Sequence, residues 1–485
     1  MKSNKKKIFS DSIFLTISSV VLKLKGLIFL PIIIPIIGMK RYGAFVQILL
    51  NPKMISPFCS LALGMGFYRF SSKLSDNDID GLSNAFWSVF WISLILSIFG
   101  GIILFLASSI ISEYILEGIG KDAIRISSIY VITGTLWTQL TKYLQSRKHF
   151  KLFSIFNFFY VLIPYLGLVF GVIVYNTLFM GFFLYVIFSF IILSILFIYI
   201  VRKLKFKWIS FIIIKDYLVY SWPLIFSNFS GGILDKIDRY FIGYFLGPLY
   251  IGYYNIIKSA VKFLDTITIP FRKYFGIYLP KMWDNGKNEK VKKQIKDGMV
   301  IYLMIVFFLL ALLVNYLNPV VEIILNKNLN KIQNYKILIL ILGLSTIFWS
   351  ISRLYNELIR LHKKNHFQLV TQAVASVINI LLNYILIMKF GIIGAGIATI
   401  ISFFIIILVK HYYFRINYDN IFAFNIIRIV IISISTIIIY NLIPPSSIIK
   451  LFLSVFFTII FYILTILISD IITKNKYSII KKYII

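Results

Sequence analysis

The sequence predicts an all-α polytopic membrane protein with about 14 transmembrane helices. Three observations indicate this fold class. The chain of 485 residues is 59% hydrophobic and only 14% charged, its mean hydropathy is +0.89, and its apolar runs are continuous. Continuous runs exclude a transmembrane barrel, whose strands alternate apolar and polar residues. Helices are the other structure that satisfies every backbone polar group in lipid.

Short polar or basic links separate the apolar runs and define the individual helices. We expect helices at residues 8–37, 42–67, 84–111, 123–145, 150–175, 178–201, 217–246, 250–278, 298–317, 332–359, 367–388, 392–409, 424–443 and 449–472. The first run follows a lysine-rich start, which resembles the front of a signal peptide. It lacks a cleavage site of small residues and continues too far for a leader, so we expect it to stay as the first helix.

The charge balance is strongly basic, with 50 Lys+Arg against 18 Asp+Glu and a net charge of +32. In a soluble protein this excess would indicate nucleic acid as the partner. Here most basic residues lie in the links on the side of the N-terminus, which the positive-inside rule places in the cytoplasm. We therefore expect both termini in the cytoplasm and no nucleic-acid partner. One cysteine, Cys59, excludes a disulfide within the chain, and the four histidines lie at helix ends or in basic links, which disfavours a metal site.

Two segments indicate an internal repeat. The turn IIGMKRYGAF at residues 36–45 corresponds to FLGPLYIGYY at residues 245–254, with two glycines at the same spacing. Trp137 and Trp349 correspond in the same order along the chain. Because both halves enter the membrane from the same side, the repeats are parallel and predict two pseudo-symmetric six-helix lobes. Chance similarity in a sequence rich in Ile, Phe and Tyr is the alternative.

This repeat predicts four parts of the chain. We expect a first lobe at residues 1–201, a cytoplasmic linker at residues 202–216 and a second lobe at residues 217–410. Residues 411–485 hold two further helices and a basic C-terminal tail.

Charged residues interrupt several predicted helices at membrane depth. In the segment 217–262 these are Asp235, Lys236, Asp238, Arg239, Lys258 and Lys262. A charge at the centre of a spanning helix costs about 2.5 to 3.5 kcal/mol, so such side chains face a cavity or one another. Asp235 and Asp238 share one helix face, as do Lys258 and Lys262. Two interpretations are open: ion pairs that lock neighbouring helices together, or the lining of a transport pathway.

The same segment carries a resemblance to a known family. SWPLIFSNFSGGILDKIDRYFIGYFLGPLYIGYYNIIKSA, at residues 221–260, resembles the polysaccharide flippase branch of the multidrug/oligosaccharidyl-lipid/polysaccharide exporter superfamily. The matching features are Pro223, the pair Asp238-Arg239, Gly247 and Gly252-Tyr253-Tyr254. The resemblance covers nearly the whole chain in helix number, and Leu-Gly-Met-Gly at residues 63–66 also fits it.

The resemblance implies a transport function. A member of this branch transfers an undecaprenyl-pyrophosphate-linked oligosaccharide across the bacterial cytoplasmic membrane, for O-antigen or capsule, by alternating access between two lobes. The partners it implies are the lipid-linked glycan, membrane lipids, a polysaccharide polymerase and a chain-length regulator. It does not name the sugar.

A cationic pathway fits this substrate, because positive side chains offset the desolvation of a pyrophosphate. Four basic residues at cytoplasmic helix ends would form a mouth: Arg69, Lys142, Arg272 and Arg353. Four lysines would lie deeper: Lys23, Lys25, Lys258 and Lys262. Anchoring of helix ends by the positive-inside rule is the alternative explanation of the mouth.

No catalytic arrangement is present in the sequence, so we expect a carrier rather than an enzyme, without a cofactor. Gly391, Gly394 and Gly396 follow a helix at the wrong spacing for a nucleotide loop, and close helix packing explains them. No phosphate-binding GK[ST] loop occurs, which disfavours direct use of ATP. Coupling to a proton or sodium gradient stays open through a charge network of Asp235, Asp238, Arg239, Asp265 and Glu357.

Three other functions compete with this interpretation. A drug/cation antiporter of the same superfamily would need an acidic lumen, which the excess of lysine disfavours. A flippase for the peptidoglycan lipid precursor shares the helix number and a cationic cavity, and it is harder to separate. A membrane polymerase or ligase would carry a large extracytoplasmic loop, whereas the longest outer link here, at about residues 318–331, is short.

Overall fold

The computed structural model describes residues 2–75, 78–325, 335–362, 364–415, 424–434 and 448–472, with the side chains of residues 2–28 outside the description. Every regular element in these ranges is a helix. Seven of the described helices are long and apolar enough to cross a membrane. The predicted all-α membrane class is confirmed.

The chain divides into two compact units, Met1–Gly252 and Tyr253–Ile485. The first unit holds α1 (Lys2–Cys59), α2 (Leu63–Ser71), α3 (Ile79–Leu106), α4 (Ser108–Leu116), α5 (Lys121–Ser127), α6 (Ile129–Ser146), α7 (Phe150–Tyr175), α8 (Leu178–Val201), α9 (Phe211–Leu246) and the first turn of α10 (Pro248–Lys262). The second unit holds the rest of α10, η1 (Phe263–Ile267), α11 (Thr268–Asp284), α12 (Asn288–Leu325), α13 (Tyr335–Leu361), α14 (Asn365–Phe414), the helix Phe424–Ile434 and α16 (Ile448–Ile472).

α1 and α14 each consist of two helices that meet at a kink. The kink is at a glycine with non-helical backbone angles, close to the turn predicted between two helices. α1 contains Gly38 at φ 76° and ψ 166°, and α14 contains Gly391 at φ 58° and ψ −140°. Gly247, which ends α9, has φ 85° and ψ 173°, nearly the same backbone conformation as Gly38. A positive φ of this kind is accessible to glycine and strained for other residues. The two turns that the repeat places in correspondence therefore share one conformation.

The second glycine of each turn lies at a close backbone crossing within the first unit. A Cβ atom added to Gly43 would overlap the carbonyl oxygen of Pro248, and one added to Gly252 would lie 2.8 Å from the carbonyl oxygen of Met39. The contact is reciprocal, since Met39 precedes Gly43 by the same spacing as Pro248 precedes Gly252. Small residues of this kind allow membrane helices to approach through their backbones.

Several helix boundaries differ from the prediction. The predicted helix 42–67 breaks after Cys59, where Leu61 and Ala62 have φ of 42° and 49°, and continues as α2. The predicted helix 84–111 divides into α3 and α4, and 123–145 divides into α5 and α6. α9 begins at Phe211, inside the segment 202–216 that was predicted as a linker. The helices predicted at 150–175 and 178–201 are confirmed as α7 and α8.

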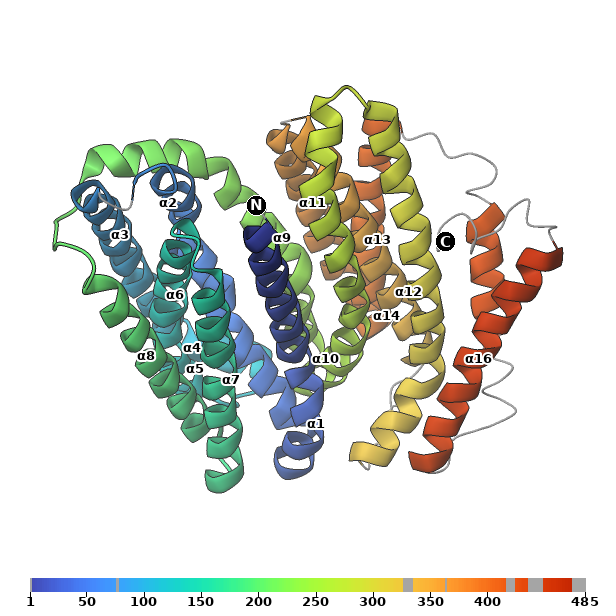
Figure 1. Ribbon diagram of the computed structural model, residues 1–485. Helices are drawn as coiled ribbons and strands as arrows, with labels where there is room; N and C mark the ends of the chain where they lie inside the picture. Colours follow the sequence, from blue (N-terminus) through green and yellow to red (C-terminus); the bar gives the residue numbers. More distant parts are fainter. Residues whose placement is uncertain are drawn as a thin grey trace. The chain divides into compact units, whose positions relative to one another are not determined.

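α9 packs against α1 and α2 in the first unit. Phe58 and Phe229 meet edge to face with ring centroids 4.2 Å apart, and Phe70 stacks on Tyr217 at 5.2 Å. The first turns of α9 lie across the upper ends of α3 and α2, and the helix then turns down along α1 (Figure 1). This course brings α9 side chains next to the C-terminal part of α1.

The core of the second unit is built mainly from α11, α12, α13 and α14. Phe275, Ile295, Tyr355 and Leu358 are among its buried members. A smaller cluster joins α12 to the helix Phe424–Ile434 and α16, and in it the hydroxyl of Tyr462 donates a hydrogen bond to the carbonyl oxygen of Met304 at 2.7 Å.

Candidate functional site in the first unit

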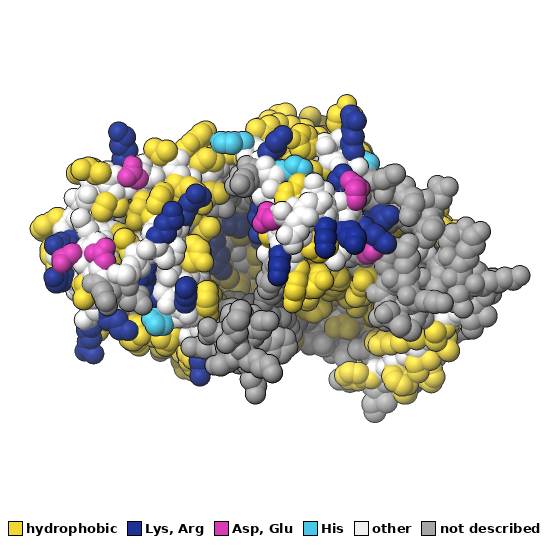
Figure 2. Space-filling view, turned by 45° about the horizontal axis from the view of Figure 1, so that its top comes forward, with side chains coloured by type: hydrophobic (Ala, Val, Ile, Leu, Met, Phe, Trp, Pro, Cys, Tyr) yellow, Lys and Arg dark blue, Asp and Glu magenta, His cyan; other side chains and the backbone are white. Residues whose placement is uncertain are grey.

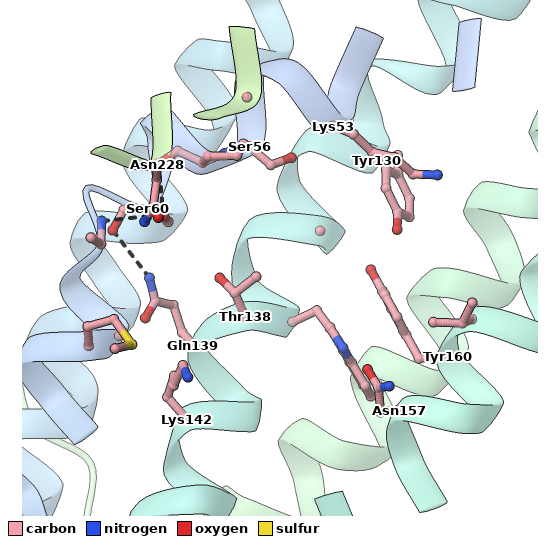
Figure 3. Close-up of a pocket in the computed structure, with 18 of the residues that line it drawn as sticks. Lys53, Ser56, Ser60, Tyr130, Thr138, Gln139, Lys142, Asn157, Tyr160 and Asn228 are labelled. Atoms are coloured by element: carbon pink, nitrogen blue, oxygen red, sulfur yellow. Dashed lines mark hydrogen bonds between the residues drawn. The ribbon is translucent and has the colours of Figure 1, made fainter. Parts of the chain in front are cut away.

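A cavity of about 610 Å³ lies within the first unit, lined by parts of α1, α2, α6, α7 and α9. Figure 3 shows Thr138, Gln139 and Lys142 of α6 and Asn157 and Tyr160 of α7 around it, with Lys53 and Ser56 of α1 and Asn228 of α9 completing the labelled wall. The volume falls in the range of roughly 300 to 1,000 Å³ typical of small-molecule sites.

Three lysines from three helices line the cavity: Lys53 of α1, Lys142 of α6 and Lys236 of α9. None of the described residues in its lining is acidic. The Lys142 ammonium donates to the side-chain oxygen of Gln145 at 2.9 Å and lies 5.7 Å from the ring centroid of Tyr68. The cavity therefore carries an excess of positive charge.

Pro57 explains how Lys236 is held at the wall. A proline inside a helix has no N–H for the carbonyl four residues earlier, so Pro57 leaves the carbonyl of Lys53 without its helical donor. The ammonium of Lys236 donates to this carbonyl oxygen at 2.9 Å. Nearby, the hydroxyl of Tyr240 donates to the side-chain oxygen of Asn51 at 2.9 Å. These bonds fix α9 against α1 beside the cavity.

Aromatic and amide side chains form the other walls. The rings of Trp137 and Tyr160 are parallel within 3°, with centroids 3.8 Å apart. Gln139 donates through its side-chain nitrogen to the carbonyl of Ser60 at 3.4 Å, while its side-chain oxygen is buried without a hydrogen-bond partner among the described residues. Aromatic faces and amides suit a sugar, which has an apolar face and a polar edge.

The break between α1 and α2 gives the cavity part of its wall. Leu61 and Ala62 adopt positive φ there, which turns the chain, so the carbonyl of Ser60 is available to Gln139. A Cβ atom added to Gly64 would lie 2.5 Å from the Gln139 side-chain oxygen. A side chain at this position would therefore displace the Gln139 amide from its place in the cavity wall.

A second polar cluster lies in the second unit and contains four of the predicted residues. Asp265, in η1, accepts hydrogen bonds from Arg353 at 2.6 Å and from the hydroxyl of Ser350 at 3.0 Å. Arg272 interacts electrostatically with Asp265, Glu357 and Arg353, and its Nε is buried without a hydrogen-bond partner in the described structure. Glu357 forms an ion pair with Arg360. The structure thus brings Asp265, Arg272, Arg353 and Glu357 together.

The other predicted pathway residues have different surroundings. Arg69 is exposed on α2, with its guanidinium carbon 4.4 Å from the ring centroid of Tyr220. Lys258 is buried, with its ammonium 5.5 Å from the ring centroid of Tyr254, and Lys262 is exposed at the end of α10. Lys23 and Lys25 lie on α1, but their side chains fall outside the described residues. A shared basic mouth, and a passage between two lobes, stay predictions.

The predicted charges of α9 are partly buried. Asp238 and Arg239 are both buried, and the Asp238 carboxylate accepts a hydrogen bond from the backbone N–H of Arg239 at 2.9 Å. Asp235 is half-buried on the same helix. Their predicted meeting with Lys258 and Lys262 stays a prediction.

The sequence did not predict that Lys53 lines a site, and it predicted Lys236 only as a charge at membrane depth. The signal for Lys53 was its charge, because it lies inside an apolar predicted helix between Pro52 and Pro57, as the other charges at membrane depth do. The stacking of Trp137 on Tyr160 depends on α6 and α7 being neighbours, and no local pattern indicated it.

Comparison with known families identifies the chain. The model of a family described as "Polysaccharide biosynthesis protein" matches residues 52–334, which is more than half of the chain. The chain belongs to this family. No curated protein sequence matches it.

Solved structures show that the fold is also found in other membrane proteins. The inward closed conformation of the lipid II flippase MurJ matches with a TM-score of 0.72 at 16% identity, over 96% of this chain and 99% of that one. An inward-facing multidrug resistance MATE family transporter of the MOP superfamily matches with a TM-score of 0.65 at 14% identity, over 82% and 98%. MATE in the bent conformation matches with a TM-score of 0.53 at 14% identity, over 85% and 95%.

The comparisons agree with the predicted link to polysaccharide biosynthesis and with the predicted fold. The family model places the chain among polysaccharide biosynthesis proteins, and the solved flippase and transporter structures show the fold that the sequence predicted.

Proposed function

We propose that this protein carries an undecaprenyl-pyrophosphate-linked oligosaccharide across the bacterial cytoplasmic membrane, for O-antigen or capsule synthesis, and that the substrate head binds in the cavity of the first unit. The observation that carries the proposal is the lining itself. Lys53, Lys142 and Lys236 converge from three helices, and no described acidic residue joins them. Membership of the polysaccharide biosynthesis family supports the substrate class.

The lysines would hold the pyrophosphate. An anion loses its hydration when it enters a membrane protein, and charge-assisted hydrogen bonds from ammonium groups compensate for this loss. Lys142 is bound by the neutral side chain of Gln145, so a phosphate oxygen can take the place of that weaker acceptor.

Trp137 and Tyr160 would bind the first sugar. Their stacked rings provide a rigid apolar wall, and the amides of Gln139 and Asn157 lie beside them in the lining. A volume of about 610 Å³ accommodates a diphosphate and a short saccharide, but not the long polyprenyl chain. The lipid tail would therefore stay in the bilayer.

The lining disfavours a drug/cation antiporter. A cationic drug would need carboxylates to offset its charge, and this cavity presents ammonium groups to its occupant. The second candidate is a flippase for the peptidoglycan lipid precursor. The observation in its favour is the match to the lipid II flippase fold over 96% of the chain, and that precursor also carries a pyrophosphate.

We propose that an ion gradient, of protons or sodium, drives the transport. Asp265 supports this proposal, because it is a buried carboxylate whose oxygens hold both Arg353 and Ser350. Both termini would face the cytoplasm, and the product would pass to a polysaccharide polymerase and its chain-length regulator.

Deletion of the gene in its bacterial host tests the substrate. We expect the mutant to lose surface polysaccharide and to accumulate the lipid-linked repeat unit inside the cell, as measured by glycan staining and lipid extraction, while peptidoglycan synthesis continues. A mutant that instead lyses and accumulates the peptidoglycan precursor would assign the second candidate. A mutant with normal glycans and raised drug sensitivity would contradict both.

A further inference from the structure

The chain connecting α8 to α9 turns at residues 202–204 and then runs without regular structure along the beginning of α3. Its residues 202–210 have the sequence RKLKFKWIS, in which basic and large apolar residues alternate from Lys203 to Trp208. We call residues 202–212 the basic strap, because the first turn of α9 continues its surface.

Side chains of α3 hold the basic strap in place. The indole N–H of Trp87 donates to the carbonyl of Lys205 at 3.0 Å, and that of Trp91 donates to the carbonyl of Lys207 at 3.4 Å. The hydroxyl oxygen of Ser83 accepts the N–H of Lys205 at 3.0 Å. Backbone groups that would otherwise need water are thus paired, so the strap has a defined surface.

This surface is apolar to an unusual degree. Trp208 stacks on Trp91 with centroids 5.7 Å apart, yet 72% of it is exposed. Phe206 and Phe211 are 56% and 73% exposed. Contiguous exposed aromatic residues indicate an interaction surface, and tryptophan is enriched where a membrane protein meets the lipid headgroups.

The same surface is basic. Arg202 and Lys203 are exposed, and Lys205 and Lys207 share one carboxylate, that of Asp80, at 2.9 and 3.3 Å. Positive charge therefore exceeds negative charge along the strap. The face shown in Figure 2 likewise presents many basic side chains among apolar ones.

We propose that the basic strap is a binding surface for anionic phospholipid headgroups. α8 is a membrane-spanning helix that ends at Val201, so the strap begins at the level of the headgroups. Trp208 and Phe206 enter the interface, and the basic residues contact lipid phosphates. A surface potential from anionic lipids attracts basic residues close to the membrane, which zwitterionic lipids do not do. This inference does not depend on the transported substrate.

Native mass spectrometry of the purified full-length protein tests the proposal, with phosphatidylglycerol and phosphatidylcholine added in equal amounts. We expect the wild-type protein to retain phosphatidylglycerol preferentially. Arg202→Gln together with Lys203→Gln should lower this preference by about fivefold or more, since each basic residue near the surface contributes an effect of that size. Trp208→Ala should lower the retention of both lipids.

The matched control removes two exposed lysines from the second unit, with Lys290→Gln and Lys293→Gln. This variant has the same change in net charge and should keep the wild-type preference. Equal retention of the two lipids by the wild-type protein would overturn the proposal, as would an equal loss of preference in the control. A thermal melt of each variant in detergent confirms that it is folded.

Discussion

At the scale of single residues, the structure shows how a side chain from another helix pairs the backbone carbonyl that loses its helical N–H donor to a proline. Pro57 removes a donor from α1, and Lys236 of α9 supplies another to the carbonyl of Lys53. A buried carbonyl without a partner costs about 1 to 3 kcal/mol. The ammonium is therefore both a helix contact and a source of positive charge for the cavity.

Arg353 likewise compensates a buried polar group, the carboxylate of Asp265. The free energy of unfolding of Arg353 variants tests this contact. Asp265 is largely buried and Arg353 half-buried, so Arg353→Met leaves a carboxylate poorly compensated. We predict that this variant is destabilised by about 3 kcal/mol. Adding Asp265→Asn to it should recover part of the loss, because the uncompensated charge is then removed. Thermal unfolding in detergent measures both effects.

The exposed pair of Arg125 and Asp122, 3.2 Å apart, provides the control. Arg125→Met should change the stability by less than about 1 kcal/mol, because solvent screens an exposed pair. If Arg353→Met were as mild as this control, the ion pair would have no structural role.

At the scale of elements, the two corresponding turns meet at a glycine crossing in the first unit. Gly38 and Gly247 share an unusual backbone conformation, and Gly43 and Gly252 each lie against the turn of the other. This reciprocity supports the internal repeat, because unrelated turns have no reason to pack in the same way on both sides.

The crossing predicts a strong effect of one methyl group. Gly43→Ala places a Cβ atom on the Pro248 carbonyl, and neither backbone can move without displacing its helix. Overpacking of a core typically costs about 1 to 3 kcal/mol, and we expect the upper end here. Gly231→Ala on α9 is the matched control, since its added Cβ meets no atom within 4 Å. Detergent-solubilised yield and melting temperature should fall for Gly43→Ala alone, and equal behaviour would contradict the crossing.

The sequence predicted some elements fully and others only in part. α7 and α8 were predicted residue by residue, because Asn176 turns the chain at φ 50° and Thr177 caps α8 by accepting the N–H of Met180. The break at Leu61 and Ala62 was missed, since neither residue favours a positive φ and tertiary contacts hold it there.

The residues of the candidate site were likewise predicted only in part. Lys142 was predicted as a substrate contact from charge at a helix end, and the structure places it in the cavity lining. Lys53 and the stacked ring of Tyr160 were not predicted, because their roles depend on which side chains of α1, α6 and α7 line a common cavity. A single sequence carries little information about that choice.

At the scale of the whole molecule, the fold is shared with a lipid II flippase and with multidrug resistance transporters. The lipid II flippase and the MATE transporters match over most of this chain at 17% identity or less. A common scaffold therefore does not set the substrate, and side chains that line a cavity must do so. In this protein the described lining of the first unit is cationic and aromatic.

The most direct test measures the affinity of the purified protein for an undecaprenyl-pyrophosphate-linked saccharide in detergent. Lys53→Gln with Lys142→Gln should weaken binding at least about tenfold, since each charged hydrogen bond contributes about 1.5 to 3 kcal/mol. Lys142→Arg should retain most of the affinity, and Lys151→Gln, an exposed lysine at the start of α7, should bind as the wild type does. Unchanged binding by the double variant would contradict the cavity as the site of the anionic head.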